Sequence, residues 1–182
     1  MKRILFLFLL GCTCSAGFAQ HFSFSTVERV EGGGIVYELE KTPVSLTYVN
    51  VRNSDKGEAA YVLLDGTPAP GSWTDYDSGK LDVDALQRVI REVFTARELE
   101  DLKTTKTRLT LCFVYDNKGA VIEVCMHFNA TSAAKALPVE RIAELEKQIK
   151  KEVTTHITDK ATLQLQFTGG AVAYNFKSMD DK

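Results

Sequence analysis

The sequence predicts an α+β domain, with an antiparallel sheet of several hairpins and two main helices packed on one face of it. Residues 22–65, 109–128 and 162–176 alternate apolar and polar side chains, which is the period of a half-buried strand. Residues 82–94 and 138–153 repeat apolar side chains every three or four positions, as amphipathic helices do. Since the strand segments are joined by turns, we expect antiparallel pairing and an α+β class.

The first strand region, residues 22–65, is expected to hold four strands: FSFSTVERV, IVYELEK, VSLTYVNV and AAYVLLD. Gly32–Gly34 accept positive φ, so a tight antiparallel turn should join the first two strands. In the second strand one face is expected to be buried and the other to be exposed to solvent. The buried face carries Ile35, Tyr37 and Leu39, and the exposed face carries Glu38 and Glu40.

A long connection follows at residues 66–79, where prolines and glycines exclude a helix or a central strand. Its aromatic residues Trp73 and Tyr76 are the best candidates for binding a ligand or partner, because such side chains stack on sugars and anchor interfaces. The alternative is that this loop folds back and Trp73 covers the edge of the core.

The predicted helices carry clear end signals. Asp82 can cap the first helix, and Thr95 with Glu98 forms a capping box for a short second helix. Pro138 suits the first turn of the helix that runs to residue 153. Glu146 and Lys150 stand four residues apart, so we expect this charged side of the last helix to face water.

Residues 109–128 form the clearest hairpin, with its turn at residues 116–119. The alternation is satisfied if paired positions have an odd sum. A sum of 237 pairs Tyr115 with Ile122 and places Cys112 opposite Cys125, whereas a sum of 235 makes the two cysteines diagonal neighbours. A bulged turn at Gly119 would instead give an even sum and separate the cysteines. A disulfide between Cys112 and Cys125 and two half-buried free thiols therefore both stay open.

The chain closes with a second expected hairpin, in which Gly169-Gly170 forms a two-residue turn and Phe167 faces Val172. The last four residues are expected to fray.

The first 19 residues have the pattern of a signal peptide: two basic residues, a short apolar run, and small residues before a cut after Ala19. The remaining residues 20–182 then form one domain, with a possible division into a β-rich lobe (20–65), the loop and an α+β lobe (80–182). Alternatively, Leu9-Leu10-Gly11-Cys12 resembles a lipobox, which would make Cys12 a lipidated N-terminus and the protein an outer-membrane lipoprotein. The mature chain contains no apolar run long enough to cross a membrane.

Composition and motifs exclude several functions. The formal net charge is −2, so nucleic acid is not an expected partner. No phosphate-binding glycine loop, Gly-x-Ser-x-Gly or His-Glu-x-x-His occurs, and His21, His127 and His156 lack ligand spacing, so we expect no cofactor and no metal. Cys125 and His127 share a strand face, but no third group orients them for catalysis.

Residues 107–167 run strand, Asp-x-x-Gly turn, strand, helix and strand, and the string FVYDNKGAVIEV resembles the hairpin of the TonB C-terminal domain family. The resemblance implies an envelope setting in a Gram-negative bacterium and supplies no catalytic residues.

The export signal and the lack of a catalytic motif favour a non-enzymatic binding module in the periplasm or cell envelope, with an envelope protein or glycan as partner. The second hypothesis is a small-molecule or carbohydrate carrier with a pocket near the Trp73 loop. An enzyme of an unrecognised type is the third.

Overall fold

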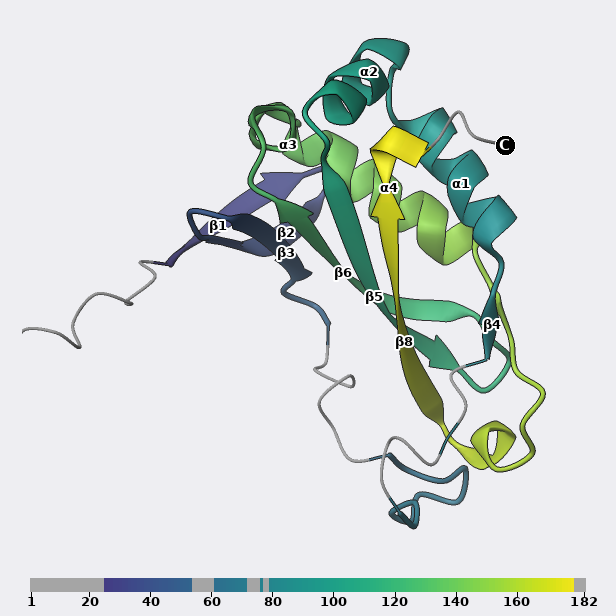
Figure 1. Cartoon of the computed structure of the whole chain (residues 1–182). Coiled ribbons are helices and arrows are strands. Elements are labelled where there is room, and N and C mark those ends of the chain that lie inside the picture. The colour runs from purple at the N-terminus through teal and green to yellow at the C-terminus, as the bar shows by residue number, and fades with distance from the viewer. Residues whose placement is uncertain (1–24, 54–60, 72–75, 77–78, 179–182) are drawn as a thin grey trace, which may run out of the picture.

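The computed structural model describes residues 25–53, 61–71, 76 and 79–178. Six strands form one antiparallel sheet in the order β1-β2-β3-β6-β5-β8. Figure 1 shows helices α1 and α4 side by side against this sheet. The predicted α+β class is therefore confirmed. The sheet strands are β1 (Thr26–Gly32), β2 (Ile35–Lys41), β3 (Ser45–Asn50), β5 (Arg108–Asp116), β6 (Val121–Asn129) and β8 (Phe167–Asn175).

The remaining elements connect or cover the sheet. A short pair formed by β4 and β7 stands apart from it. No helix in the described part of the chain is long and apolar enough to cross a membrane. The elements outside the six-stranded sheet are β4 (Lys80–Leu81), α1 (Val83–Val93), α2 (Ala96–Thr104), α3 (Ser132–Ala136), α4 (Val139–Glu152), β7 (Thr155–His156), and the 3-10 helices η2 (Thr162–Gln164) and η3 (Phe176–Ser178).

The helices begin where the sequence predicts. The Asp82 carboxylate accepts a hydrogen bond from the Ala85 amide at 2.8 Å, and Thr95 and Glu98 form the complete capping box. Pro138 immediately precedes α4. The short helix α3 was not predicted, and Thr131 caps it through the Ala134 amide.

The β1–β2 turn at Gly33-Gly34 has positive φ at both residues, as predicted. Gly32, at the end of β1, packs closely against the first turn of α4. A Cβ at this position would be only 2.5 Å from the carbonyl carbon of Val139. The end of β1 therefore fixes how closely α4 approaches the sheet.

The β5–β6 hairpin combines two of the registers that the sequence allowed, an even sum beside the turn and a sum of 237 beyond it. Next to the turn, Tyr115 pairs with Val121, so the predicted pair of Tyr115 with Ile122 is wrong. A bulge then shifts the register, and from Val114 onward the pairs sum to 237. Ile122 is the extra residue of this bulge and takes no partner on β5. Bulges redirect side chains, and Ile122 faces the pocket described below.

The predicted hairpin at Gly169-Gly170 is wrong. Strand β8 runs straight through both glycines and pairs with β5 along its whole length. Gly169 instead permits close packing on the face away from the helices: its Cβ position would be 3.3 Å from the Phe113 carbonyl oxygen and 4.0 Å from the Tyr61 hydroxyl.

The fourth strand expected near residues 59–65 is also absent from the sheet. Ala59 and Ala60 lie outside the described residues, and the residues that follow form a turn. Two isolated bridges, Val62 with Pro68 and Leu63 with Leu165, hold this turn. Strands from both sides of residue 66, where a division into lobes was considered, pair within the one sheet.

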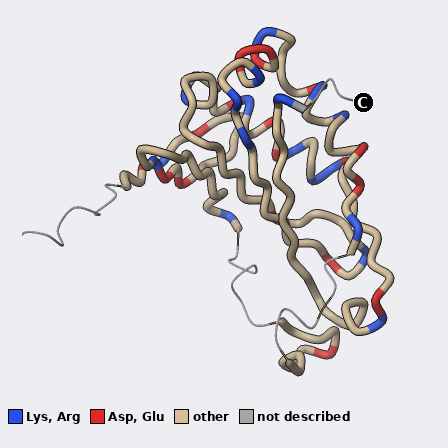
Figure 2. The backbone as a smooth tube through the Cα atoms, in the orientation of Figure 1, with Lys and Arg blue, Asp and Glu red and all other residues tan. Residues whose placement is uncertain are grey.

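Charges are distributed unevenly over this fold. Figure 2 shows Lys, Arg, Asp and Glu gathered on the helices and on β1 and β2, while β5 and β8 are mostly uncharged along their length. On α4, however, one charged residue, Glu146, is buried against the sheet.

Candidate functional site

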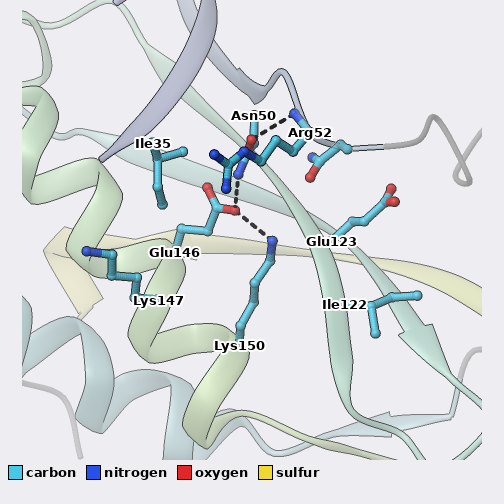
Figure 3. A pocket seen from close by; sticks show the side chains of 9 residues that line it. Ile35, Asn50, Arg52, Ile122, Glu123, Glu146, Lys147 and Lys150 are labelled. Atoms are coloured by element: carbon cyan, nitrogen blue, oxygen red, sulfur yellow. Dashed lines mark hydrogen bonds and ion pairs between the residues drawn. The ribbon is translucent and has the colours of Figure 1, made fainter. Parts of the chain in front are cut away.

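A pocket of about 270 Å³ opens between α4 and the ends of β2, β3 and β6 (Figure 3). Its lining combines charged, amide and aliphatic side chains. The sheet side contributes Ile35, Asn50, Arg52, Asn53, Ile122 and Glu123. The helix side contributes Glu146, Lys147 and Lys150.

Glu146 forms the floor of this pocket and is 1% exposed. Its carboxylate accepts three hydrogen bonds of 2.7 Å: from the Tyr37 hydroxyl, from the Asn50 side-chain amide and from the Lys150 ammonium. The expectation that this side of α4 faces water is therefore wrong for Glu146. A buried charge of this kind is stable only when it is fully paired, and here it is.

The register of β2 against β3 places two of these donors, Tyr37 and Asn50, side by side. Tyr37 on β2 pairs directly with Asn50 on β3, so both side chains leave the sheet at the same place and meet one carboxylate. Burial, and then the hydrogen bond to Glu146, raise the pKa of the Tyr37 phenol above its usual value. The phenol thus stays protonated and remains a donor.

Residues at the mouth of the pocket are also held by hydrogen bonds, in part through Asn50, which donates to Glu146. The Asn50 side-chain oxygen accepts a hydrogen bond of 2.9 Å from the Arg52 amide, and the Asn53 side chain donates to the Val124 carbonyl oxygen at 3.3 Å. The Lys147 ammonium donates to the Gly33 carbonyl oxygen at 2.9 Å. The backbone at Arg52 is therefore held in place by the amide that contacts Glu146.

This arrangement is suited to binding. The Glu146 oxygens already accept from three protein donors and are almost inaccessible, so they are poorly placed to exchange a proton with a ligand. The rim offers cationic donors and two isoleucine side chains. Within the described ranges, no group of three His, Cys, Asp or Glu side chains could hold a metal ion.

Cys112 and Cys125 lie on the other face of the sheet, away from the helices, directly opposite each other on β5 and β6. Both are free thiols in this structure. Burial, with a smaller contribution from Cys112, raises the pKa of the Cys125 thiol to about 11, and burial also raises the pKa of Cys112. A thiol that stays protonated is a weak nucleophile, which disfavours a catalytic pair with His127. The His127 ring instead hydrogen-bonds Thr47 at 2.7 Å.

We predict that an added disulfide oxidant links Cys112 to Cys125 within one chain, because directly opposed strand residues are near enough to bridge. Thiol titration of the unfolded chain of residues 20–182, whose two cysteines are Cys112 and Cys125, measures this before and after oxidation. Loss of both thiols without dimer formation is the expected result, and the Cys112→Ser variant should keep its single thiol free of intramolecular bonding. Two thiols remaining after oxidation would rule the bridge out.

The other residues proposed from the sequence are separate from this pocket. Trp73 and Cys12 lie outside the described residues. The Tyr76 hydroxyl donates to the Pro70 carbonyl oxygen at 2.5 Å, and its ring packs edge-on against Tyr61. Tyr61 in turn packs against Phe167, so Tyr76 belongs to a small aromatic cluster at the start of β8.

Sequence reasoning missed the pocket, although one signal was present. Tyr37 lies on the apolar face of its strand, and Glu146 lies four residues after Ile142 and three before Ile149, on the apolar stripe of α4. Polar groups in such positions usually meet a buried partner.

Comparisons with known proteins agree with the fold. The sequence matches the family DUF5043, described as a domain of unknown function, over residues 35–168. The structure is similar to the crystal structure, at 1.85 Å resolution, of a DUF5043 family protein from Bacteroides uniformis ATCC 8492. That match has a TM-score of 0.61 and 18% identity and covers 82% of this chain and 85% of the other. No curated protein matches the sequence. The family match spans all of the described residues that line the pocket.

Proposed function

Since this chain belongs to the DUF5043 family, a domain of unknown function, we propose its role from its own geometry: it is an exported, non-enzymatic binding module that holds a small ligand in the pocket above Glu146. The observation that carries this proposal is the fully paired, buried carboxylate at the base of an open pocket. A lining that is already held by hydrogen bonds favours binding, because fewer side chains lose conformational freedom when the ligand binds.

Three features support binding over other uses of the pocket. The lining comes from four elements of the fold, and hydrogen bonds hold Asn50 and Asn53 in place. The rim keeps charged donors in reach of solvent, whereas Glu146 itself is covered. At about 270 Å³ the pocket is slightly below the range of roughly 300–1,000 Å³ for drug-sized ligands. The ligand should therefore be small.

The setting of this module in the periplasm or cell envelope rests on the signal-like residues 1–19, and the resemblance to the TonB C-terminal domain family points to the same compartment. The segment 107–167 does run strand, turn, strand and helix, but its closing residues form η2 before β8 begins at Phe167. The described residues that line the pocket come from outside the loop at residues 66–79.

Ligand binding at the pocket is tested with a variant that fills it. Ile122→Trp places a larger side chain in the lining of the pocket, at a residue that is not a hydrogen-bond partner of Glu146. Val44→Trp, at a residue that is 75% exposed, is the matched control. We expect that small sugars, amino acids and organic acids, screened by thermal shift, include a ligand that stabilises the parent and the control but not Ile122→Trp. A ligand that stabilises all three equally would place binding elsewhere and contradict the proposal, as would a screen without any binder.

A further inference from the structure

The pocket carries more positive than negative charge. The lining contains three cationic side chains, Arg52, Lys147 and Lys150, and two carboxylates, Glu123 and Glu146. The chain as a whole has the opposite balance, with a net charge of −2. A local excess of cations in an acidic protein indicates a negatively charged ligand.

The three cations are not equally available. The Lys147 ammonium is bonded to the Gly33 carbonyl oxygen, and the Lys150 ammonium neutralises Glu146 with one of its three donors. The Arg52 guanidinium has no hydrogen-bond or ion-pair partner among the residues that the structure describes. Lys147 also keeps two donors, but Figure 3 shows its side chain extending away from Arg52 and Lys150. Arg52 and the two remaining donors of Lys150 are therefore the groups that a ligand can use.

Arg52 is also directed at the pocket. Its backbone amide is fixed by the Asn50 side chain, and Figure 3 shows its side chain extending across the mouth above Glu146. Lys150 reaches the same space from α4. Ile35 and Ile122 supply the apolar part of the lining.

From this geometry we infer that the ligand is a small monocarboxylate, whose carboxylate is bound by Arg52 and Lys150 and whose apolar body contacts Ile122. This inference rests on the proposed function. A guanidinium binds carboxylate through two parallel hydrogen bonds, and the lysine adds a third donor. A phosphate fits less well, because a second negative charge would be repelled by Glu123 and Glu146 and the excess of cations is only one.

The test compares three kinds of probe on the full mature chain at fixed ionic strength: propionate and hexanoate, inorganic phosphate, and glucose. Calorimetric titration should show binding of the monocarboxylates, with hexanoate tighter because its chain covers more apolar surface. Arg52→Gln should weaken that binding about 10-fold or more, since it removes a charge-assisted pair. Arg97→Gln, at an arginine whose side chain is 94% exposed on α2, should bind as the parent does.

The outcomes separate this inference from the proposed function. If phosphate binds more tightly than the carboxylates, or if Arg52→Gln leaves carboxylate binding unchanged, the inference is overturned. If glucose binds, and Ile122→Trp but not Arg52→Gln abolishes that binding, the pocket is a ligand site of another class, and only the inference fails. If no screened ligand depends on Ile122, the proposed function fails as well.

Discussion

Replacing Glu146 with alanine is expected to lower the free energy of unfolding by roughly 3 kcal/mol, an unusually large loss for a charged residue of an amphipathic helix. The substitution leaves the buried Tyr37 hydroxyl and Asn50 amide without their acceptor, at about 1–3 kcal/mol each. Lys150 is less affected, because its side chain is 30% exposed and regains water. Urea unfolding of the full chain measures the change.

Glu144→Ala is the matched control for this prediction. Glu144 is a half-buried residue on the same helix and accepts a hydrogen bond from Gln148 at 2.7 Å, four positions along. Loss of a helix-surface pair of this kind costs only about 0.2–0.5 kcal/mol. If Glu146→Ala were as mild as Glu144→Ala, the carboxylate would not be the anchor between α4 and the sheet that we describe.

Replacing Gly119 with alanine should destabilise the protein by about 2–5 kcal/mol. Gly119 has φ +82°, a conformation that costs other residues about 1–2 kcal/mol, and a Cβ there would overlap the carbonyl oxygen of Thr155. That oxygen is backbone and cannot move aside easily, so overpacking adds about 1–3 kcal/mol. The Gly119 carbonyl oxygen also accepts a hydrogen bond from the Thr155 amide at 2.8 Å, so the clash would disturb this contact between the β5–β6 turn and β7.

Gly34→Ala separates the two contributions to this loss. Gly34 has a similar φ of +78°, but nothing lies within 4 Å of its Cβ position. The control should therefore show only the conformational cost of about 1–2 kcal/mol. Thermal unfolding of both variants compares them directly. Equal losses would show that Gly119 has no special packing role.

Local rules predicted the parts of this fold that local interactions determine. The caps at Asp82 and Thr95 depend on residues three positions apart, and the structure contains both. The Gly33-Gly34 turn depends on its own φ values. Alternation allowed the pairing of Cys112 with Cys125 as one of several registers, and the structure contains this pair together with a bulge beside the turn.

Local rules failed where distant segments decide the structure. Gly169-Gly170 has the composition of a hairpin turn, but β5 offers a partner to every residue of β8 and the chain continues straight. Likewise, Glu146 and Lys150 are a pair that usually lies on a solvated helix face. Tyr37, more than a hundred positions earlier, is what makes burial of Glu146 stable. The candidate pocket depends on these long-range contacts, so the sequence could not place it.

The most direct test of the proposed site is an NMR titration of the ¹⁵N-labelled full mature chain with hexanoate. We predict that amide shifts concentrate at Arg52, Ile122 and the part of α4 around Glu146 and Lys150, and that they saturate together. Shifts centred instead on Tyr61, Tyr76 and Phe167, or no saturable shifts at all, would contradict a ligand site above Glu146.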